Sequence, residues 1–316
     1  MNNLKKIGLT ALAGSLVVTS AFAGELTATG SASMGVANIT GTADDGKGKN
    51  FSMGNSVYLA GGGELDNGMT VALSFEMDQG TANNSDEGFD NHYVEIGSDA
   101  LGTLRLSGHG GSSAQGAMDT TAAGDLWNNT LGLTGGPAAA ASGNNSLFYT
   151  LPALVDGVAV TASLAPGGTA GTNASTHMSY GVSYTGVEGL TVNYGVGDSG
   201  VQGAEVDHTT MSASYAIGSL TLSVSRTDID NAGSTADIEW DSYQVAYTIS
   251  ENISATYGSE TVDTGGTSVD EEVTGFGVSY TTGGMTISAS QINAEGGANS
   301  ATADTDKWSL SAAFAF

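Results

Sequence analysis

Apolar residues alternate with small or polar residues along most of this chain. Near the C-terminus, Trp308, Leu310, Ala312, Phe314 and Phe316 fall on one face of an extended strand, because strand side chains alternate with a period of two. The other face carries serine and alanine. Such a strand suits the closing position of a membrane barrel, with its apolar face toward lipid and its polar face toward a water-filled lumen. We therefore expect Trp308, Phe314 and Phe316 to mark the membrane closure.

Period-two segments recur along the chain and are separated by two kinds of link. Segments 26–36, 69–78, 158–164 and 220–225 show the alternation clearly, and each predicts a strand. Short, turn-like links lie at 64–68, 99–102, 152–157, 186–189, 217–219, 250–252 and 282–284. Longer acidic links lie near 39–50, 79–89, 110–144, 166–176, 198–206, 228–238, 262–271 and 293–305. Their alternation predicts an all-β fold, a transmembrane up-and-down antiparallel β-barrel of about 16 strands.

Four tyrosines repeat at nearly equal spacing. Tyr184, Tyr215, Tyr247 and Tyr280 each lie just before a short link, at successive intervals of 31, 32 and 33 residues. Parity places all four on the apolar face. Rings at one height around a barrel would form an aromatic girdle at the membrane interface. The alternative is a repeated soluble hairpin in which these tyrosines are ordinary core residues.

The N-terminal residues have the pattern of an export signal. Two lysines precede an apolar run over residues 7–18, and the sequence Ala-Phe-Ala follows at 21–23. This arrangement predicts a secretory signal peptide, residues 1–23. No later segment has the roughly 18 uninterrupted apolar residues that a spanning helix needs. We expect residues 24–316 to form a single transmembrane β-barrel domain that crosses the membrane with strands.

The exported chain is strongly acidic and has no cysteine. Of 7 basic residues, two belong to the predicted signal peptide, and 33 acidic residues follow it. The remaining five basic and 33 acidic residues give a formal charge of −28. Phosphate contacts need clustered Lys and Arg, so this charge excludes nucleic acid as a partner. The acidic links instead predict a solvated outer rim that attracts cations.

The third long link, residues 110–144, is much the longest of the chain. Links beyond about 15 residues are usually functional. Its acidic residues are Asp119 and Asp125, and several apolar side chains could attach it to an inner wall. We expect it to fold into the lumen as a pore constriction loop, with its carboxylates facing charges on the opposite wall. Parity predicts that the pore wall includes Arg105, His109, Glu76, Asp78 and Glu95. For Arg105, the alternative is a plain strand residue paired with a nearby carboxylate.

One acidic segment resembles a calcium-binding loop. Asp228, Asp230 and Glu239 occupy the first, third and twelfth positions of that template, and an alanine replaces the ligand at the fifth. No helical pattern flanks the segment, so an EF-hand is excluded and a chance match is the leading explanation. No cofactor is required by any feature of the chain. Loose Ca²⁺ binding by acidic outer loops is the remaining hypothesis, because this ion prefers oxygen ligands.

The sequence does not favour an enzyme. The four histidines are scattered without metal-ligand spacing, and no Gly-x-Ser-x-Gly nucleophile motif is present. Asp207 and His208 are adjacent, but neighbouring strand residues point to opposite faces. The stronger rival to a membrane channel is an exported soluble β-repeat surface protein or adhesin. Release without detergent and absence of conductance would identify that rival.

In several stretches the chain resembles the Gram-negative general diffusion porins, of the alphaproteobacterial type. The likeness is carried by residues 25–35 at the mature start, by 101–106 and 147–152, and by the terminal Phe316. It implies location in the cell outer membrane and a homotrimer of 16-stranded barrels. Each barrel would hold a water-filled pore, narrowed by the third long loop, for passive diffusion of small hydrophilic solutes and ions. Outer-membrane lipid and lipopolysaccharide would surround it.

The chain departs from the resemblance in one respect. Related porins have a cluster of basic side chains opposite the acidic loop, whereas here only Arg105, helped by His109, is available. We therefore expect a weakly cation-selective pore. Arg226 has lipid-facing parity near the outer end of its strand, where it would reach lipopolysaccharide phosphate or snorkel to the rim.

Overall fold

The computed structural model describes most of the chain after the predicted signal peptide. The described residues are 26–41, 48–78, 89–118, 122, 126, 131, 133, 139–167, 175–201, 204–233, 236–266 and 269–316. Residues 1–23 lie outside them, as do Asp119 and Asp125 of the predicted constriction loop.

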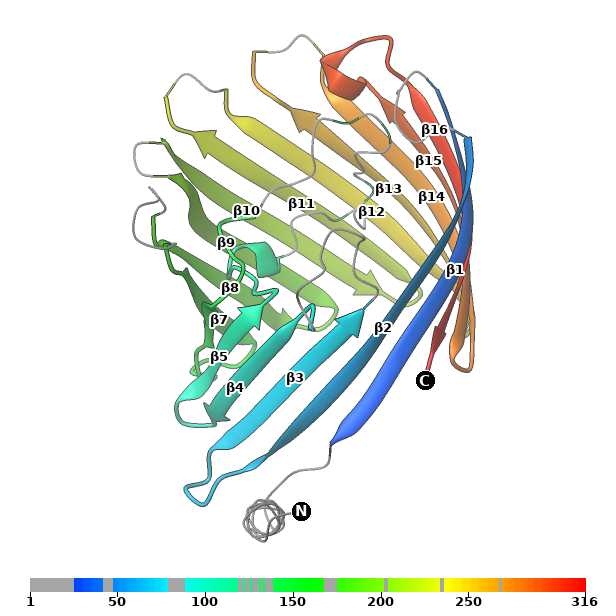
Figure 1. Cartoon of the computed structure of the whole chain (residues 1–316). Helices are drawn as coiled ribbons and strands as arrows, with labels where there is room; N and C mark the ends of the chain where they lie inside the picture. The colour runs from blue at the N-terminus through cyan, green and yellow to red at the C-terminus, as the bar shows by residue number, and fades with distance from the viewer. Residues whose placement is uncertain are drawn as a thin grey trace, which may run out of the picture.

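Sixteen strands of the described residues form one closed antiparallel barrel (Figure 1). Each strand pairs with its neighbours in sequence, and the first pairs with the last. A closed ring leaves no unpaired strand edge, and this arrangement confirms the predicted up-and-down barrel. The strands are β1 (Thr27–Gly41), β2 (Gly48–Glu64), β3 (Thr70–Asp78), β4 (His92–Ser98), β5 (Gly102–His109), β6 (Ser146–Thr150), β7 (Val158–Ala165), β8 (His177–Val187), β9 (Leu190–Val201), β10 (Ala204–Ile217), β11 (Leu220–Asn231), β12 (Ile238–Ser250), β13 (Ile253–Asp263), β14 (Glu271–Thr282), β15 (Met285–Glu295) and β16 (Thr305–Ala315).

The terminal residue takes part in closing the ring. The Phe316 amide donates to the Gly30 carbonyl oxygen at 3.0 Å, and the Gly30 amide donates to the Phe316 carbonyl oxygen at 2.8 Å. The Phe316 ring covers Gly30, where a Cβ atom would lie 2.5 Å from the ring. Gly30 therefore leaves the space that the terminal ring fills. Phe314 and Trp308 are exposed on the same strand face as Phe316.

The seven short links join consecutive strands where the sequence predicts turns, at one end of the barrel (Figure 1). Two of them show why glycine is needed. Gly189 has φ 75° and Gly218 has φ 58°, values that side chains with a Cβ atom rarely adopt. At Gly189 a Cβ atom would also lie 2.4 Å from the Ala216 carbonyl oxygen. Glycine at these positions in the sequence therefore correctly predicts turns between the strands.

Some of the predicted long links are partly strand. The link expected near 198–206 shrinks to residues 202–203, because β9 continues to Val201 and β10 begins at Ala204. The link expected near 228–238 likewise shrinks to 232–237. Polar and acidic residues suggested loops there. A strand that extends beyond the apolar band is solvated on both faces, however, and so it tolerates those residues.

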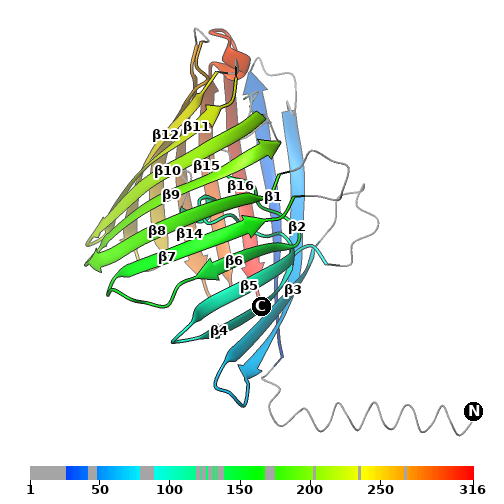
Figure 2. The ribbon, with the colours of Figure 1, turned by 90° about the vertical axis from the view of Figure 1, so that its left-hand side faces the viewer.

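The two faces of the barrel wall differ in chemistry. The strands run obliquely around the barrel (Figure 2), and their outward side chains form an exposed apolar band. That band includes Tyr184, Tyr215, Tyr247 and Tyr280. These tyrosines are therefore not the core of a soluble hairpin. Many inward side chains are small hydroxyls that pair across strands, as Ser290 and Ser309 do at 2.6 Å between Oγ atoms.

Helical structure is minor in the described residues. Two short 3₁₀ turns occur, η2 (Gly116–Met118) after β5 and η4 (Gly297–Asn299) before β16. No helix in the described part of the chain is long and apolar enough to span a membrane. Of the two turns, η2 matters for function, because it contacts β8, β9 and β10.

Candidate pore lining

Arg105 and Glu95 form an ion pair on adjacent strands. Glu95 on β4 and Arg105 on β5 are directly opposite in the strand register. The Arg105 Nε and Nη2 atoms lie 2.9 and 2.8 Å from the same carboxylate oxygen, Glu95 Oε2. Exposed ion pairs of this kind contribute little to the stability of the fold. Because both side chains stay partly exposed, the guanidinium can still contact solutes that pass along this wall.

Two aromatic side chains flank this ion pair. The Arg105 Cζ atom lies 4.1 Å from the centroid of the Tyr93 ring, a typical cation–π distance. Phe148 on β6 is opposite Arg105 in the register on the other side. The ion pair and both rings line a pocket of about 340 Å³. Its other lining residues are Asn91, Thr103, Ser107, His109, Gly110, Ser112, Ala117 and Thr150.

Glu76 is a buried carboxylate on β3 that two neighbouring side chains hold. The Tyr58 hydroxyl donates to Glu76 Oε1 at 2.5 Å, and the Asn91 Nδ2 donates to Glu76 Oε2 at 2.6 Å. Charge-assisted hydrogen bonds of this kind offset the cost of burying a carboxylate. These hydrogen bonds hold the Glu76 carboxylate in place. Asn91, which binds it, also lines the pocket, so this negative charge lies near the pocket.

The remaining predicted wall residues lie at the edge of this region. His109 lines the pocket, and its Nδ1 atom lies 4.0 Å from Asp90 Oδ1. Asp78 is exposed at the end of β3. We call the inner face of β2 to β6 that carries Tyr58, Glu76, Tyr93, Glu95, Arg105, His109 and Phe148 the open wall.

Hydroxyl groups on the rest of the inner wall bind the backbone of the long link between β5 and β6. The Ala114 amide donates to Ser163 Oγ at 2.9 Å and to Ser179 Oγ at 2.8 Å. The two serine hydroxyls are themselves 2.6 Å apart. All these groups are buried, so the serine pair satisfies an amide that would otherwise lack a partner.

The turn η2 is attached in the same way. The buried Gln115 side chain donates through Nε2 to Thr210 Oγ1 at 2.6 Å and accepts the Ala140 amide on Oε1 at 2.7 Å. The Ser212 hydroxyl donates to the Met118 carbonyl oxygen at 2.9 Å. One glutamine thus joins both ends of the link to the wall. Its burial makes both hydrogen bonds costly to lose.

Two further amides of the link meet the wall. The Ala122 amide donates to Ser225 Oγ at 2.9 Å and also to Ser242 Oγ. The Leu126 amide donates to the buried carboxylate of Glu260 at 3.2 Å. These contacts reach across β11 to β13, far from the strands that begin and end the link. The described residues of this segment therefore lie inside the barrel.

Glycines on the wall leave room for the link. A Cβ atom at Gly181 would lie 2.8 Å from both the Ala114 carbonyl oxygen and Met118 Cε. At Gly195 it would lie 2.8 Å from Met118 Cγ and 2.9 Å from Gln115 Cα. Such contacts are closer than packed atoms allow. The backbone of the link can approach these strands only because they carry glycine here.

An apolar cluster completes the attachment near β11 to β15. Leu131 is 1% exposed and Leu133 is also buried, and both belong to one cluster with Trp240, Val262 and Val273. These wall residues point inward, against the usual polarity of a lumen. Their burial by the link explains the exception. We call the inner faces of β7 to β15, where they bind the link through hydroxyls, glycines and this cluster, the loop seat.

Comparison with known proteins identifies the family. The Gram-negative porin family model matches residues 8–261. The chain belongs to this family. Its members are outer-membrane channels for passive diffusion and are not enzymes. The porin is thus a protein of the Gram-negative outer membrane. Among curated proteins, no sequence matches it significantly.

Solved structures share the porin's fold. A loop-deletion mutant of OmpT, an outer membrane protein of Vibrio cholerae, is 16% identical with a TM-score of 0.70, and the match covers 93% of this chain and 99% of that one. An anion-selective porin from Comamonas acidovorans is 16% identical with a TM-score of 0.66, covering 92% and 99%. A mutant of the Rh. blastica porin is 12% identical with a TM-score of 0.68, covering 92% and 100%.

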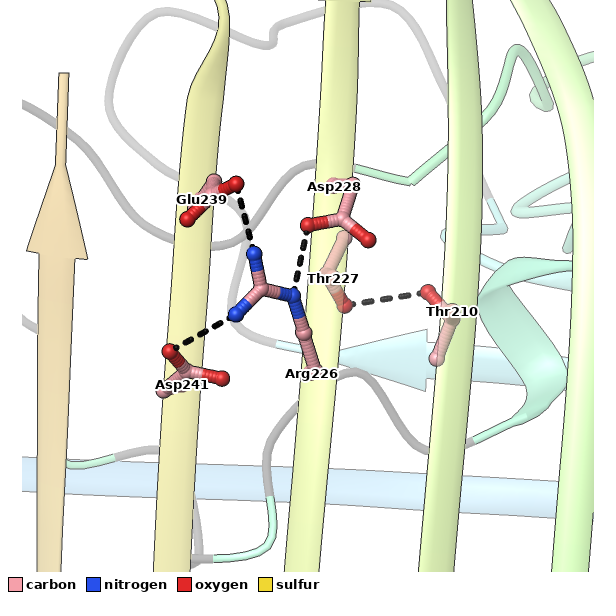
Figure 3. Close-up of polar contacts among 6 residues, drawn as sticks. All are labelled: Thr210, Arg226, Thr227, Asp228, Glu239 and Asp241. Atoms are coloured by element: carbon pink, nitrogen blue, oxygen red, sulfur yellow. Dashed lines mark hydrogen bonds and ion pairs between the residues drawn. The ribbon is translucent and has the colours of Figure 1, made fainter. Parts of the chain in front are cut away.

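The porin's Arg226 lies on the outer face among three carboxylates (Figure 3). Its Nε is 2.8 Å from Asp228 Oδ1, its Nη2 is 2.5 Å from Glu239 Oε1, and its Nη1 is 3.3 Å from Asp241 Oδ2. Two of the residues matching the calcium template thus bind a guanidinium, while Asp230 lies two residues further along β11. No group of three or more His, Asp or Glu side chains within the described ranges is arranged to hold a metal ion.

Apolar side chains of the link were expected to attach it to an inner wall, and Leu131 and Leu133 do so in this porin. Parity along the strands predicted that Arg105, Glu95 and His109 share one face, and the structure brings these three together. The sequence did not predict that serine pairs and glycines on distant strands meet the link. A signal was present, because small residues alternate inward over 177–197. Only the barrel closure shows that the link reaches them.

Proposed function

We propose that this porin passes small hydrophilic solutes and ions with weak cation selectivity. The observation that supports this most is the charge of the inner wall. Arg105 is paired to Glu95 and Lys307 shares the inward parity of Ser309, whereas Glu76, Glu260 and Glu271 add further carboxylates among the described residues. A lumen with excess negative charge lowers the energy of cations and raises that of anions. The two carboxylates predicted on the constriction loop, Asp119 and Asp125, would increase this preference.

Two measurements test this function. Liposome swelling with neutral sugars of increasing size gives the size limit, and reversal potential in a salt gradient across a planar bilayer gives the selectivity. The proposal predicts swelling with small sugars and a modest potential of the sign expected for cations. A reversal potential of the sign expected for anions would contradict the proposed cation selectivity. Absence of conductance would instead favour the soluble adhesin alternative.

We further propose a homotrimer of the alphaproteobacterial type, exported with removal of residues 1–23. One of the similar structures is described as a trimer form of the Vibrio cholerae OmpT. On the outer face of β1 and β2, three large apolar side chains are highly exposed: Phe51 is 87% exposed, Met53 67% and Met34 61%. Exposed apolar patches mark protein or lipid contacts. Phe51→Cys gives each chain a single thiol, because the sequence has no cysteine, so a thiol crosslinker in outer-membrane fractions can join two chains. Crosslinked dimer bands support this contact, and monomer alone refutes it.

We propose lipopolysaccharide as the lipid that surrounds the outer rim and calcium as the cation that the acidic cluster of this rim binds. Arg226 is surrounded by three acidic groups, so the cluster has excess negative charge and suits a cation better than a bare phosphate. Loose Ca²⁺ binding by Asp228, Asp230 and Glu239 would supply that cation. A chelator should then lower the melting temperature of the wild type and leave Asp230→Asn less affected. Identical melting with and without chelator would remove the calcium proposal.

A further inference from the structure

We propose that the pocket between Arg105, Tyr93 and Phe148 is a weak binding site for neutral saccharides in transit through the pore. This inference rests on the proposed channel function and names a class of solute for it. The pocket has a volume of about 340 Å³, at the lower end of the range for small-molecule sites. It lies on the open wall, where Arg105 and Glu95 stay partly exposed, and Gly110, Ser112 and Ala117 of the link also line it.

Aromatic side chains are unevenly placed around the described inner wall. Most exposed aromatic residues point outward toward lipid. Trp240, which points inward, is covered by the apolar cluster of the loop seat. Tyr93 and Phe148 face the lumen on β4 and β6 and flank the same pocket. A lumen made only for water and ions needs no ring at these positions, because aromatic rings are poorly hydrated.

The two rings are not equivalent. The Tyr93 ring is already covered by the Arg105 guanidinium at 4.1 Å. Phe148 is half-buried, opposite Arg105 in the register, and is the ring whose face can receive the C–H groups of a sugar. Apolar C–H faces pack on aromatic rings through dispersion and burial.

The polar groups of the pocket suit hydroxyls. The guanidinium uses Nε and Nη2 on Glu95 Oε2, so its Nη1 can donate to a solute and Glu95 Oε1 can accept from one. Thr103 and Thr150 line the same pocket and can do both. A sugar hydroxyl is both donor and acceptor, and this mixed set satisfies it in either role.

The charge balance favours a neutral solute over an ion. An anion attracted to Arg105 would approach the Glu95 carboxylate that is bonded to it. An organic cation would find the face of Tyr93 already occupied by a guanidinium. A neutral polyol is repelled by neither charge. It can bind while Arg105 and Glu95 keep their own hydrogen bonds to each other.

Single-channel recording in planar bilayers tests the site. Adding a di- or trisaccharide to wild-type protein should reduce the open current with a saturable concentration dependence. Phe148→Leu, which keeps an apolar side chain and removes the flat ring, should raise the half-saturating concentration about fivefold. Ser288→Ala is the matched control, because Ser288 lies on the inner wall at another pocket, away from the open wall, and should leave the value unchanged.

The outcomes separate this inference from the channel function. No conductance at all refutes the channel function and the site together. Normal conductance with only the linear, viscosity-like decrease that an equal-sized polyethylene glycol gives refutes the saccharide site alone. Saturable block by glycine or choline but not by sugars assigns the pocket to charged solutes and overturns the class. If Phe148→Leu does not fold, Thr150→Val supplies the second variant and should also weaken the block.

Discussion

The loop seat and the open wall are two parts of one inner surface, and they differ in what their side chains are for. The seat consists of small hydroxyls, glycines and an apolar cluster. These groups already contact the link, at Ala114, Gln115 and Leu131. The open wall offers larger side chains, Arg105 and Phe148 among them, that face the pocket. The loop seat thus holds the link that narrows the pore, whereas the open wall presents the side chains that solutes meet.

Polarity alone does not identify a pore wall in this barrel. Both regions follow the same period-two pattern, and both carry polar groups on the inside. Buried hydroxyls that accept backbone amides, such as Ser163 and Ser179, act as structural anchors. Partly exposed groups such as Arg105 and Glu95 remain available to solutes. Substitutions in the seat should therefore change the size or the steadiness of the channel current, and substitutions in the open wall should change selectivity.

The largest effect is expected from Leu131→Asp. This side chain is 1% exposed in the apolar cluster, and losing its packing alone costs about 3 kcal/mol, to which the buried charge adds. The link should leave its seat, and single-channel conductance should rise. Trp240 emission should shift to the red in a background carrying Trp127→Phe and Trp308→Phe. Leu131→Met is the control, and wild-type conductance in Leu131→Asp would contradict the seat.

Gly195→Ala should have the next largest effect. The new Cβ atom would lie 2.8 Å from Met118 Cγ and 2.9 Å from Gln115 Cα, and overpacking of this kind costs roughly 1–3 kcal/mol. The barrel ladder should hold, so the turn η2 should move toward the pore axis and lower the conductance. Gly61→Ala, where the nearest atom to the new Cβ would be Leu26 Cδ1 at an ordinary 3.6 Å, is the control. Equal conductance of the two variants would argue against close contact at η2.

Removing the hydroxyl pair under Ala122 should have a smaller effect. In the double variant Ser225→Ala, Ser242→Ala, this amide loses both of its hydroxyl acceptors, at about 1 kcal/mol for each neutral hydrogen bond. We expect the same mean conductance with more frequent subconductance states. Ser290→Ala, Ser309→Ala removes a pair that bonds to itself and should leave the current quiet. Equal noise in both double variants would count against the anchoring role.

Arg105→Ala should change stability least and selectivity clearly. The ion pair with Glu95 is partly exposed, so its loss costs at most about 1 kcal/mol. A unit charge about 4 Å from a passing ion changes its energy by about 1 kcal/mol in water. The cation-to-anion permeability ratio should therefore rise severalfold, measured as reversal potential. Arg226→Ala on the outer face is the control, and an equal shift in both variants would place Arg105 outside the ion path.

Much of the fold could be predicted from the sequence because it depends on local pattern. The outward tyrosines followed from period-two alternation, and the short turns from residues such as Gly189 and Gly218. The strand ends were harder, since β9 and β10 continue through polar residues to Val201 and Ala204. Of the candidate site, the shared face of Arg105 and His109 was readable, because it needs only parity along one strand.

The sequence by itself determined the barrel, its polarity and the side of the wall on which each residue lies, since alternation fixes a face at every position. Only the tertiary structure decided which of those faces meet the long link and which line the passage. Ala114 lies 49 residues before Ser163 and 65 before Ser179, and Ala122 lies 120 before Ser242. Such contacts exist only after the ring has closed, because closure brings distant strands around one lumen.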